Sequence, residues 1–148
     1  MHLGSRKRYL EKRVRGYRTV ECVIKTLKAE HKQQTHVLAL MINLQFYFRK
    51  NANIISVGDY FVPARYGDLY NEVMKGEGCP SYLTRLNISA VITQSLHRNR
   101  SLWWPRYYSK LRARLRECGY IEYSCGEKSV ALFLKSDIKP HVSLQPVL

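Results

Sequence analysis

Acidic residues are scarce in this chain. Its 148 residues include 11 Asp and Glu against 25 Lys and Arg, which gives a formal net charge of +14. Such an excess says little about fold but points to polyanionic partners, either nucleic acid or an anionic membrane surface. Long apolar runs are also missing. The longest, HVLALMINLQFYF, is shorter than the roughly 18 residues that a membrane-spanning helix needs and carries Asn43 and Gln45. Basic amphipathic helices of useful length are absent too, so we predict no membrane partner.

Motifs of catalysis and of metal binding are equally scarce. The five histidines are scattered along the chain, and no glycine-rich phosphate loop occurs. The main acids of the middle region, Asp59, Asp68, Glu72 and Glu77, pair with no lysine or histidine at a recognisable spacing. We therefore predict that the protein is not an enzyme and uses no cofactor, no metal and no small-molecule substrate.

The four cysteines form no Cys-x-x-Cys pair, the spacing typical of a zinc site or a redox motif. They are Cys22, Cys79, Cys118 and Cys125. We expect four free thiols in a reducing compartment, because disulfides are rare there.

Two regions are expected on either side of the stretch KGEGCPS, which places two glycines and a proline within seven residues. Residues 1–80 begin with a basic arm, which has the composition of an organelle transit peptide or of an arm that binds phosphates in place. Apolar spacing then predicts a helix from about residue 18, a second helix over 36–48, and a strand or irregular loop over 51–70, with its β-like run at 54–57. We interpret residues 1–80 as a basic, mainly helical extension.

Residues 81–148 show a more regular pattern. The expected elements are a helix over 81–100, a short strand SLWW, a helix over 108–118, and a β-hairpin formed by YIEYS and SVALFLK. The tail, with two prolines, is expected to add an edge strand. The order helix, strand, helix, strand, strand predicts an α+β domain in which both helices cover one face of a small sheet.

The segment from Arg98 to Arg116 carries seven basic residues and no acid, with aromatic residues interleaved. A solvated helix whose arginine stems cover apolar surface is the ordinary alternative. The combination instead favours nucleic-acid binding, because cations contact phosphates while aromatic rings and arginine planes stack on unpaired bases. The predicted RNA-binding residues are Arg98, Arg100, Arg106, Tyr107, Ser109, Lys110, Arg112, Arg114 and Arg116.

The stretch YYSKLRARLRECGYIEYSCGEKSVALFLKSDIKPHVSL resembles the N-terminal domain of the universal small-subunit ribosomal protein number eight. The resemblance rests on Ser109-Lys110-Leu111, on the pattern Glu117-x-Gly119-Tyr120-Ile121 and on Leu134-Lys135, and spans about 60 residues, Asn87 to Val147. The second domain of that family, with its Ser-Thr-Ser loop, has no counterpart here, and the first 80 residues match nothing in the family.

This resemblance implies a structural constituent of the small ribosomal subunit. Its partners would be the central domain of small-subunit rRNA and neighbouring ribosomal proteins. Lys110, Arg112, Arg114 and Arg116 would contact phosphates, assisted by the preceding arginines, and phosphate contacts fix position without reading sequence. A shortened core with a long private extension is typical of a divergent mitochondrial ribosome, so the expected location is the mitochondrial matrix.

Two other functions fit the same pattern. In a winged-helix DNA-binding protein, the helix from Ser109 to Cys118 would enter the major groove and the hairpin would form the wing. That helix offers mainly arginines to base edges, which suits phosphates better than base readout. In a protein-only assembly subunit, acidic neighbours would balance the charge.

Overall fold

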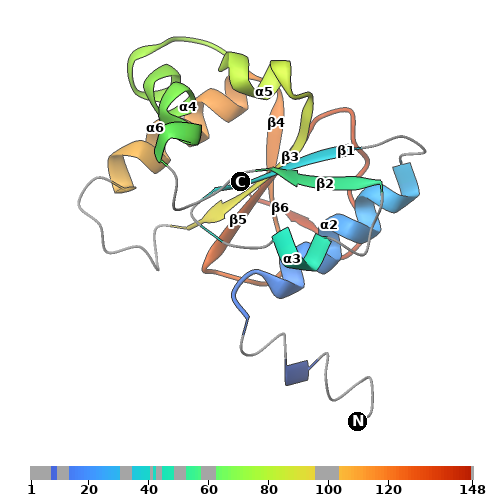
Figure 1. The fold of residues 1–148 in the computed structure, drawn as a ribbon. Helices are drawn as coiled ribbons and strands as arrows, with labels where there is room; N and C mark the ends of the chain where they lie inside the picture. The colour runs from blue at the N-terminus through green and yellow to red at the C-terminus, as the bar shows by residue number, and fades with distance from the viewer. Residues whose placement is uncertain are drawn as a thin grey trace.

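In the computed structural model, the described part of the chain forms one six-stranded sheet between two layers of helices (Figure 1). The described residues are 8–9, 14–30, 35–40, 42, 45–48, 53–57, 63–95 and 104–147. In chain order the elements are α2 (Tyr17–Glu30), β1 (Thr35–Leu40), α3 (Gln45–Phe48), β2 (Ile54–Val57), α4 (Pro63–Lys75), α5 (Ser81–Arg85), β3 (Ile88–Gln94), α6 (Trp104–Glu117), β4 (Tyr120–Ser124), β5 (Val130–Lys135) and β6 (Gln145–Pro146).

The strand order is β2-β1-β3-β5-β4-β6. The first three strands are parallel to one another, whereas β3, β5, β4 and β6 pair in antiparallel fashion. Strands from before and after residue 80 thus share one sheet, with β1 next to β3. The boundary expected at residue 80 lies in the loop between α4 and α5, and strands from both sides of it belong to this sheet.

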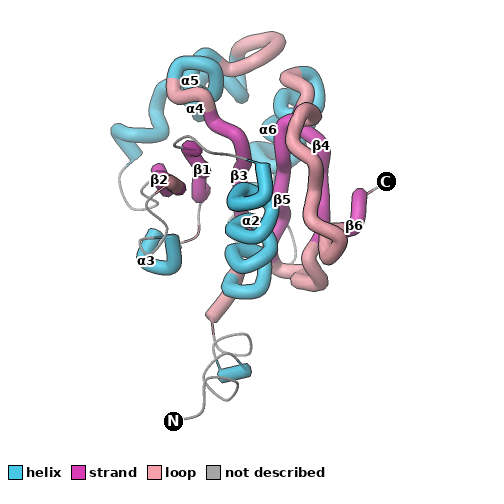
Figure 2. The backbone as a smooth tube through the Cα atoms, turned by 90° about the vertical axis from the view of Figure 1, so that its right-hand side faces the viewer, coloured by secondary structure: helices cyan, strands magenta, loops and turns pink. Residues whose placement is uncertain are grey.

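Each face of the sheet has its own apolar core. Side chains of α2 and α3 pack with Val37, Ile92 and Leu132 on one face, while α4, α5 and α6 pack with Leu38 and Phe133 on the other. The two views of the backbone show α2 and the α4–α6 group on opposite sides of the sheet (Figure 2). The α+β class is confirmed, but helices cover both faces instead of one.

Two predicted helices are wrong, for the same reason. Residues 35–40 form strand β1 instead of the start of a helix, and residues 88–94 form strand β3. Both segments are almost fully buried, because a strand covered on both faces presents an unbroken apolar run. Such a run has no two-residue alternation, so periodicity alone cannot distinguish it from a buried helix. β-Branched residues such as Val91 and Ile92 were the remaining signal for a strand.

Other elements match the sequence more closely. Helix α2, strand β2, the hairpin β4–β5 and the edge strand β6 occupy the expected segments. The order helix, strand, helix, strand, strand is also present, as α5-β3-α6-β4-β5, although the first two elements lie earlier than expected. Residue 104 of the expected SLWW strand begins α6, and the rest of that segment lies outside the described residues. Helix α4 was not anticipated, because its sequence was interpreted as a strand or irregular loop.

The cysteines form two disulfide bonds, which contradicts the expectation of free thiols. Cys22 in α2 bonds to Cys125 in the β4–β5 turn, with 6.6 Å between their Cα atoms. Cys79, before α5, bonds to Cys118, after α6, with 5.0 Å between their Cα atoms. The sequence separations are 103 and 39 residues, so local spacing could not reveal either pair.

The β4–β5 turn also caps the first described long helix. Glu127 accepts hydrogen bonds from the backbone N–H groups of Gly16 (2.9 Å) and Thr19 (2.6 Å), and from the Thr19 hydroxyl (2.7 Å). The first turn of α2 contains no acidic residue of its own. Glu127 therefore supplies both the acceptor and the negative charge that a helix N-terminus favours.

Candidate nucleic-acid interface

Helix α6 carries most of the predicted binding residues, and its buried side fixes where each of them lies. Trp104, Tyr107, Tyr108, Leu111 and Leu115 are buried against the sheet and α4. Tyr107 stacks on Tyr70 of α4, with ring centroids 5.2 Å apart. The predicted contact between Tyr107 and RNA is therefore not supported, because only 4% of this residue is exposed.

Lys110 and Arg114 lie on the flank of α6 that faces the end of α4. The Lys110 ammonium donates to the carbonyl oxygen of Met74 at 3.1 Å, and the Arg114 guanidinium donates to that of Gly76. Arg114 also contacts Glu117 at 3.3 Å. The last carbonyls of a helix lack partners within the helix, and cations near them are favoured by the helix dipole. These two side chains thus hold α4 against α6.

Arg112 lies on the other flank of α6 and forms an ion pair across to β4. Its Nε donates to Glu122 Oε1 at 2.6 Å, and the side chains of Arg112 and Glu122 are 33% and 10% exposed. A cation paired with a nearly buried carboxylate attracts a phosphate less than a free one does, because the two charges largely cancel at a distance.

Arg106, Ser109 and Arg116 remain on the outer surface of α6 together with Ala113. On a helix, residues three and four apart share one face. Ser109 and Ala113 are small, so the surface between the two arginines is open. Arg106 and Arg116 are ten residues apart, which corresponds to about 15 Å along the axis. Arg98 and Arg100 lie outside the described residues.

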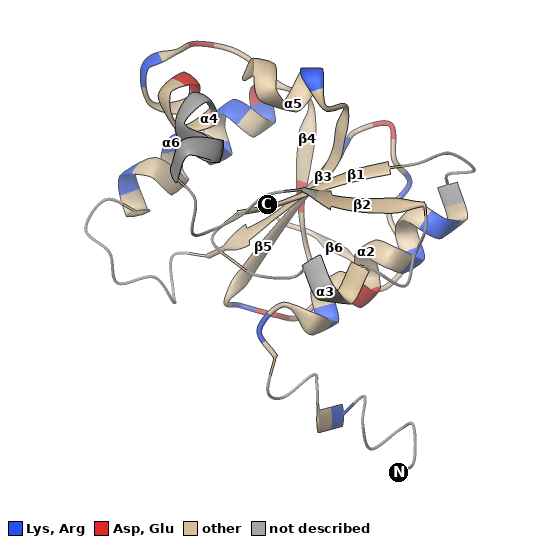
Figure 3. Cartoon of the chain, viewed as in Figure 1, with Lys and Arg blue, Asp and Glu red and all other residues tan. Residues whose placement is uncertain are grey.

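Cationic side chains are also exposed on the opposite layer. Lys25 and Lys28 lie on the outer surface of α2. Figure 3 shows Lys and Arg on helices of both layers, while the strands between them carry little charge. The positive charge predicted from composition is therefore distributed over both sides of the sheet.

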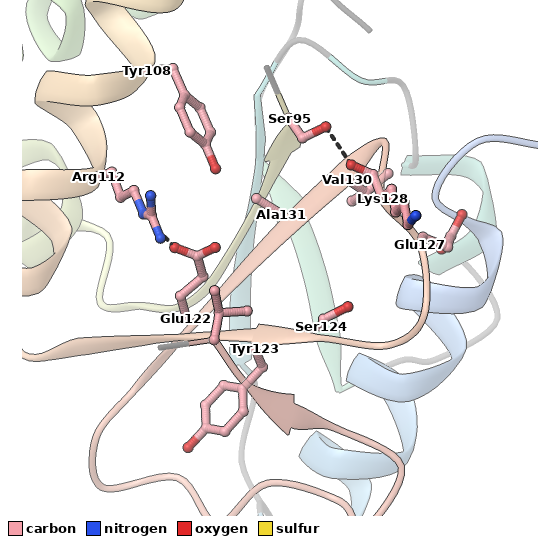
Figure 4. Close-up of a pocket in the computed structure, with 11 residues that line it drawn as sticks. Ser95, Tyr108, Arg112, Glu122, Tyr123, Ser124, Glu127, Lys128, Val130 and Ala131 are labelled. Carbon is pink, nitrogen blue, oxygen red and sulfur yellow. Dashed lines mark hydrogen bonds and ion pairs between the residues drawn. The ribbon is translucent and has the colours of Figure 1, made fainter. Parts of the chain in front are cut away.

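A cavity of about 250 Å³ lies where the first half of α6 meets β4 and β5 (Figure 4). Tyr108, Arg112 and Glu122 line one side, and Ala131 forms its floor. The remaining lining residues are Ser95, Tyr123, Ser124, Glu127, Lys128, Val130 and Val147. Burial and the neighbouring Glu122 carboxylate raise the pKa of Tyr108, so its hydroxyl stays protonated and able to donate at neutral pH.

Sequence reasoning identified Arg112 but missed the residues opposite it. Glu122 and Lys128 come from the β4–β5 hairpin, outside the basic segment 98–116. One weak signal pointed to Glu122: it is an acid close in sequence to a basic helix, and it lies two residues from the buried Tyr120, on the same face of the strand.

Comparison with family models, with curated proteins and with solved structures finds no match for this chain. Within the described part, no group of three or more His, Cys, Asp or Glu is placed to hold a metal ion. Among the helices described, none is both long enough and apolar enough to cross a membrane.

Proposed function

We propose that this protein binds RNA as a structural constituent of the small ribosomal subunit. The observation that carries the proposal is the net charge of +14, part of which is displayed by arginines on the outer face of α6. The element order α5-β3-α6-β4-β5 agrees with the order of helix, strand, helix, strand and strand that the resemblance implies. However, residues 88–94, which the resemblance assigns to the first helix, form strand β3.

The outer face of α6 is the proposed phosphate-binding surface, with Arg106 and Arg116 as the principal contacts and Ser109 as a neutral donor between them. Lys110 and Arg114 have a smaller role in binding, because they already contact backbone carbonyls of α4 and its following loop. The cations of α2 would contact a neighbouring protein.

The arrangement does not favour the winged-helix alternative. A wing projects from its domain, whereas the β4–β5 hairpin lies inside the sheet, with β5 paired to β3 and β4 paired to β6. A protein-only assembly role makes a different prediction in the experiment below, because such a subunit would not bind isolated RNA.

The location is a separate proposal. The resemblance suggests the mitochondrial matrix, but disulfides are uncommon in reducing compartments and this chain has two. The oxidation state of the cysteines in protein isolated from cells under thiol-blocking conditions tests the compartment. Free thiols would support the matrix, and two intact disulfides would argue against it.

Crosslinking in cells, followed by sequencing of the attached nucleic acid, is the decisive test of function. We expect crosslinks in the central domain of a small-subunit rRNA. In vitro, neutralisation of one phosphate each by Arg106 and Arg116 should reduce affinity about tenfold between 50 and 200 mM salt.

Charge-reversal variants test which surface of the protein binds RNA. The double variant Arg106→Glu/Arg116→Glu should weaken RNA binding far more than Lys25→Glu/Lys28→Glu, which makes the same charge change on the opposite layer. DNA crosslinks, or none above background together with no RNA binding in vitro, would refute the proposal.

A further inference from the structure

The cavity between α6 and the hairpin contains unused hydrogen-bonding groups. Among the described residues, the Tyr108 hydroxyl and Glu122 Oε2 have no hydrogen-bond partner, and Arg112 uses only its Nε. Arginine has five N–H donors and a carboxylate accepts at both oxygens. Figure 4 shows the phenol and the Arg112–Glu122 pair directed toward the space above Ala131.

The charge of the cavity disfavours a phosphate. Arg112 is paired with Glu122, whereas the Glu127 carboxylate accepts from the N-terminus of α2 and Lys128 also lines the cavity. An anion entering beside Arg112 would therefore also meet the Glu122 carboxylate. A neutral ligand with both donors and acceptors on one edge fits better, because a buried polar group is stable only when it is hydrogen-bonded.

The volume of the cavity limits the size of the ligand. Pockets for drug-sized ligands measure roughly 300–1,000 Å³, whereas this cavity measures about 250 Å³. Ala131 forms its floor, while the side chains of Val130 and Tyr123 belong to the core on the opposite face of the sheet (Figure 4). A single flat heterocycle with polar groups at its edge matches these dimensions.

We propose that this cavity binds one unpaired guanine base of an RNA, with the Glu122 carboxylate accepting from the base and Arg112 and Tyr108 donating to it. Along one edge, guanine carries two adjacent donors, the 2-amino group and N1–H. They are followed by two acceptors, O6 and then N7. Arginine donates in bidentate fashion to O6 and N7 in known recognition, and unpaired bases are the usual targets of sequence-specific RNA binding. The inference rests on the proposed RNA binding and adds base selectivity to it.

The other bases match less well. Adenine places a donor amino group where guanine has O6, so it would oppose the Arg112 donors. Uracil offers one ring donor to the carboxylate instead of two groups side by side. Cytosine has an amino donor but a ring acceptor beside it, which would face the carboxylate of Glu122.

The test measures the affinity of the full chain for four RNA hairpins that differ only in one bulged nucleotide, at fixed salt. We expect the guanine hairpin to bind roughly 5- to 150-fold more tightly than the others, the range for one good bidentate base contact. Tyr108→Phe should reduce this preference while leaving the affinity for the other three hairpins within about twofold. Glu122→Gln also frees the charge of Arg112, so it should reduce the ratio of guanine affinity to the other affinities even if all four hairpins bind more tightly. Tyr108→Phe removes only the hydroxyl and keeps the buried ring, so it guards against loss of folding.

Arg116→Ala is the matched control, since Arg116 lies on the outer face of α6 and not in the cavity. It should weaken all four hairpins equally. Equal affinity of the unaltered protein for all four would overturn the inference and leave the proposed RNA binding standing. Failure to bind any hairpin would overturn both.

Discussion

The cap that Glu127 places on α2 leads to a quantitative prediction for stability. In Glu127→Ala, two backbone N–H groups and the Thr19 hydroxyl lose their acceptor. Loss of a cap typically costs about 1 kcal/mol, and loss of a negative charge at a helix N-terminus costs about 0.3–1 kcal/mol. Because hydrogen bonds to charged groups exceed the average, we expect a total of about 2 kcal/mol in the free energy of unfolding.

Thermal unfolding followed by circular dichroism measures this loss. For a chain of this length, 1 kcal/mol shifts Tm by roughly 2–4 °C, so Glu127→Ala should lower Tm by about 4–8 °C. Glu127→Gln keeps an acceptor oxygen without the charge and should lose roughly half as much.

The control is Glu77→Ala. Glu77 is an exposed acid in the loop after α4 and forms no ion pair with any described residue, so its removal should change stability by less than about 0.5 kcal/mol. If Glu127→Ala behaves like Glu77→Ala, the hairpin does not cap the helix and the reasoning is refuted.

Three further predictions concern other contacts. Arg114→Ala should destabilise the fold by about 1–2 kcal/mol, because the Gly76 carbonyl loses a charged donor, yet change RNA affinity less than Arg116→Ala does; the reverse ranking would contradict the assignment. Burial, with a smaller contribution from Asp137, raises the pKa of Tyr120 to about 12. This contribution to stability should therefore be fully present below pH 10 and be lost above it. At pH 11 the unaltered protein should have lost about 1.4 kcal/mol more than Tyr120→Phe in chemical denaturation. Alkylation in denaturant without reductant should modify none of the four cysteines, whereas four modified thiols would contradict both disulfides. Because the Cys79–Cys118 bond closes a loop of 39 residues, Cys79→Ser should lower the free energy of unfolding by up to about 4 kcal/mol.

Local patterns predicted the elements whose buried and exposed sides differ. Helix α6 has an apolar stripe that includes Leu111 and Leu115. This asymmetry repeats at the helix period, so it is readable in the sequence. Strands β1 and β3 have no such asymmetry, because helices cover both faces of the sheet.

The site was harder to predict than the fold. Counting charges located the basic helix, but could not separate Arg116, which is exposed, from Arg112, which pairs with Glu122. That distinction depends on which elements pack beside α6, and sequence spacing does not contain it. The disulfides were missed for the same reason, since each joins segments that only the tertiary fold brings together.

The link between α2 and the β4–β5 turn also constrains how the chain can fold while it is being synthesised. The acceptor for the Gly16 N–H lies 111 residues downstream. At about 5–20 residues per second, synthesis of that interval takes roughly 6–22 s. Throughout it, α2 lacks its cap, its partner cysteine and the strand β5 against which its apolar side packs. Helix α2 must therefore wait for strand β5 before its apolar side is fully covered, and until then a chaperone could bind the part of that side that β1 and β3 leave open.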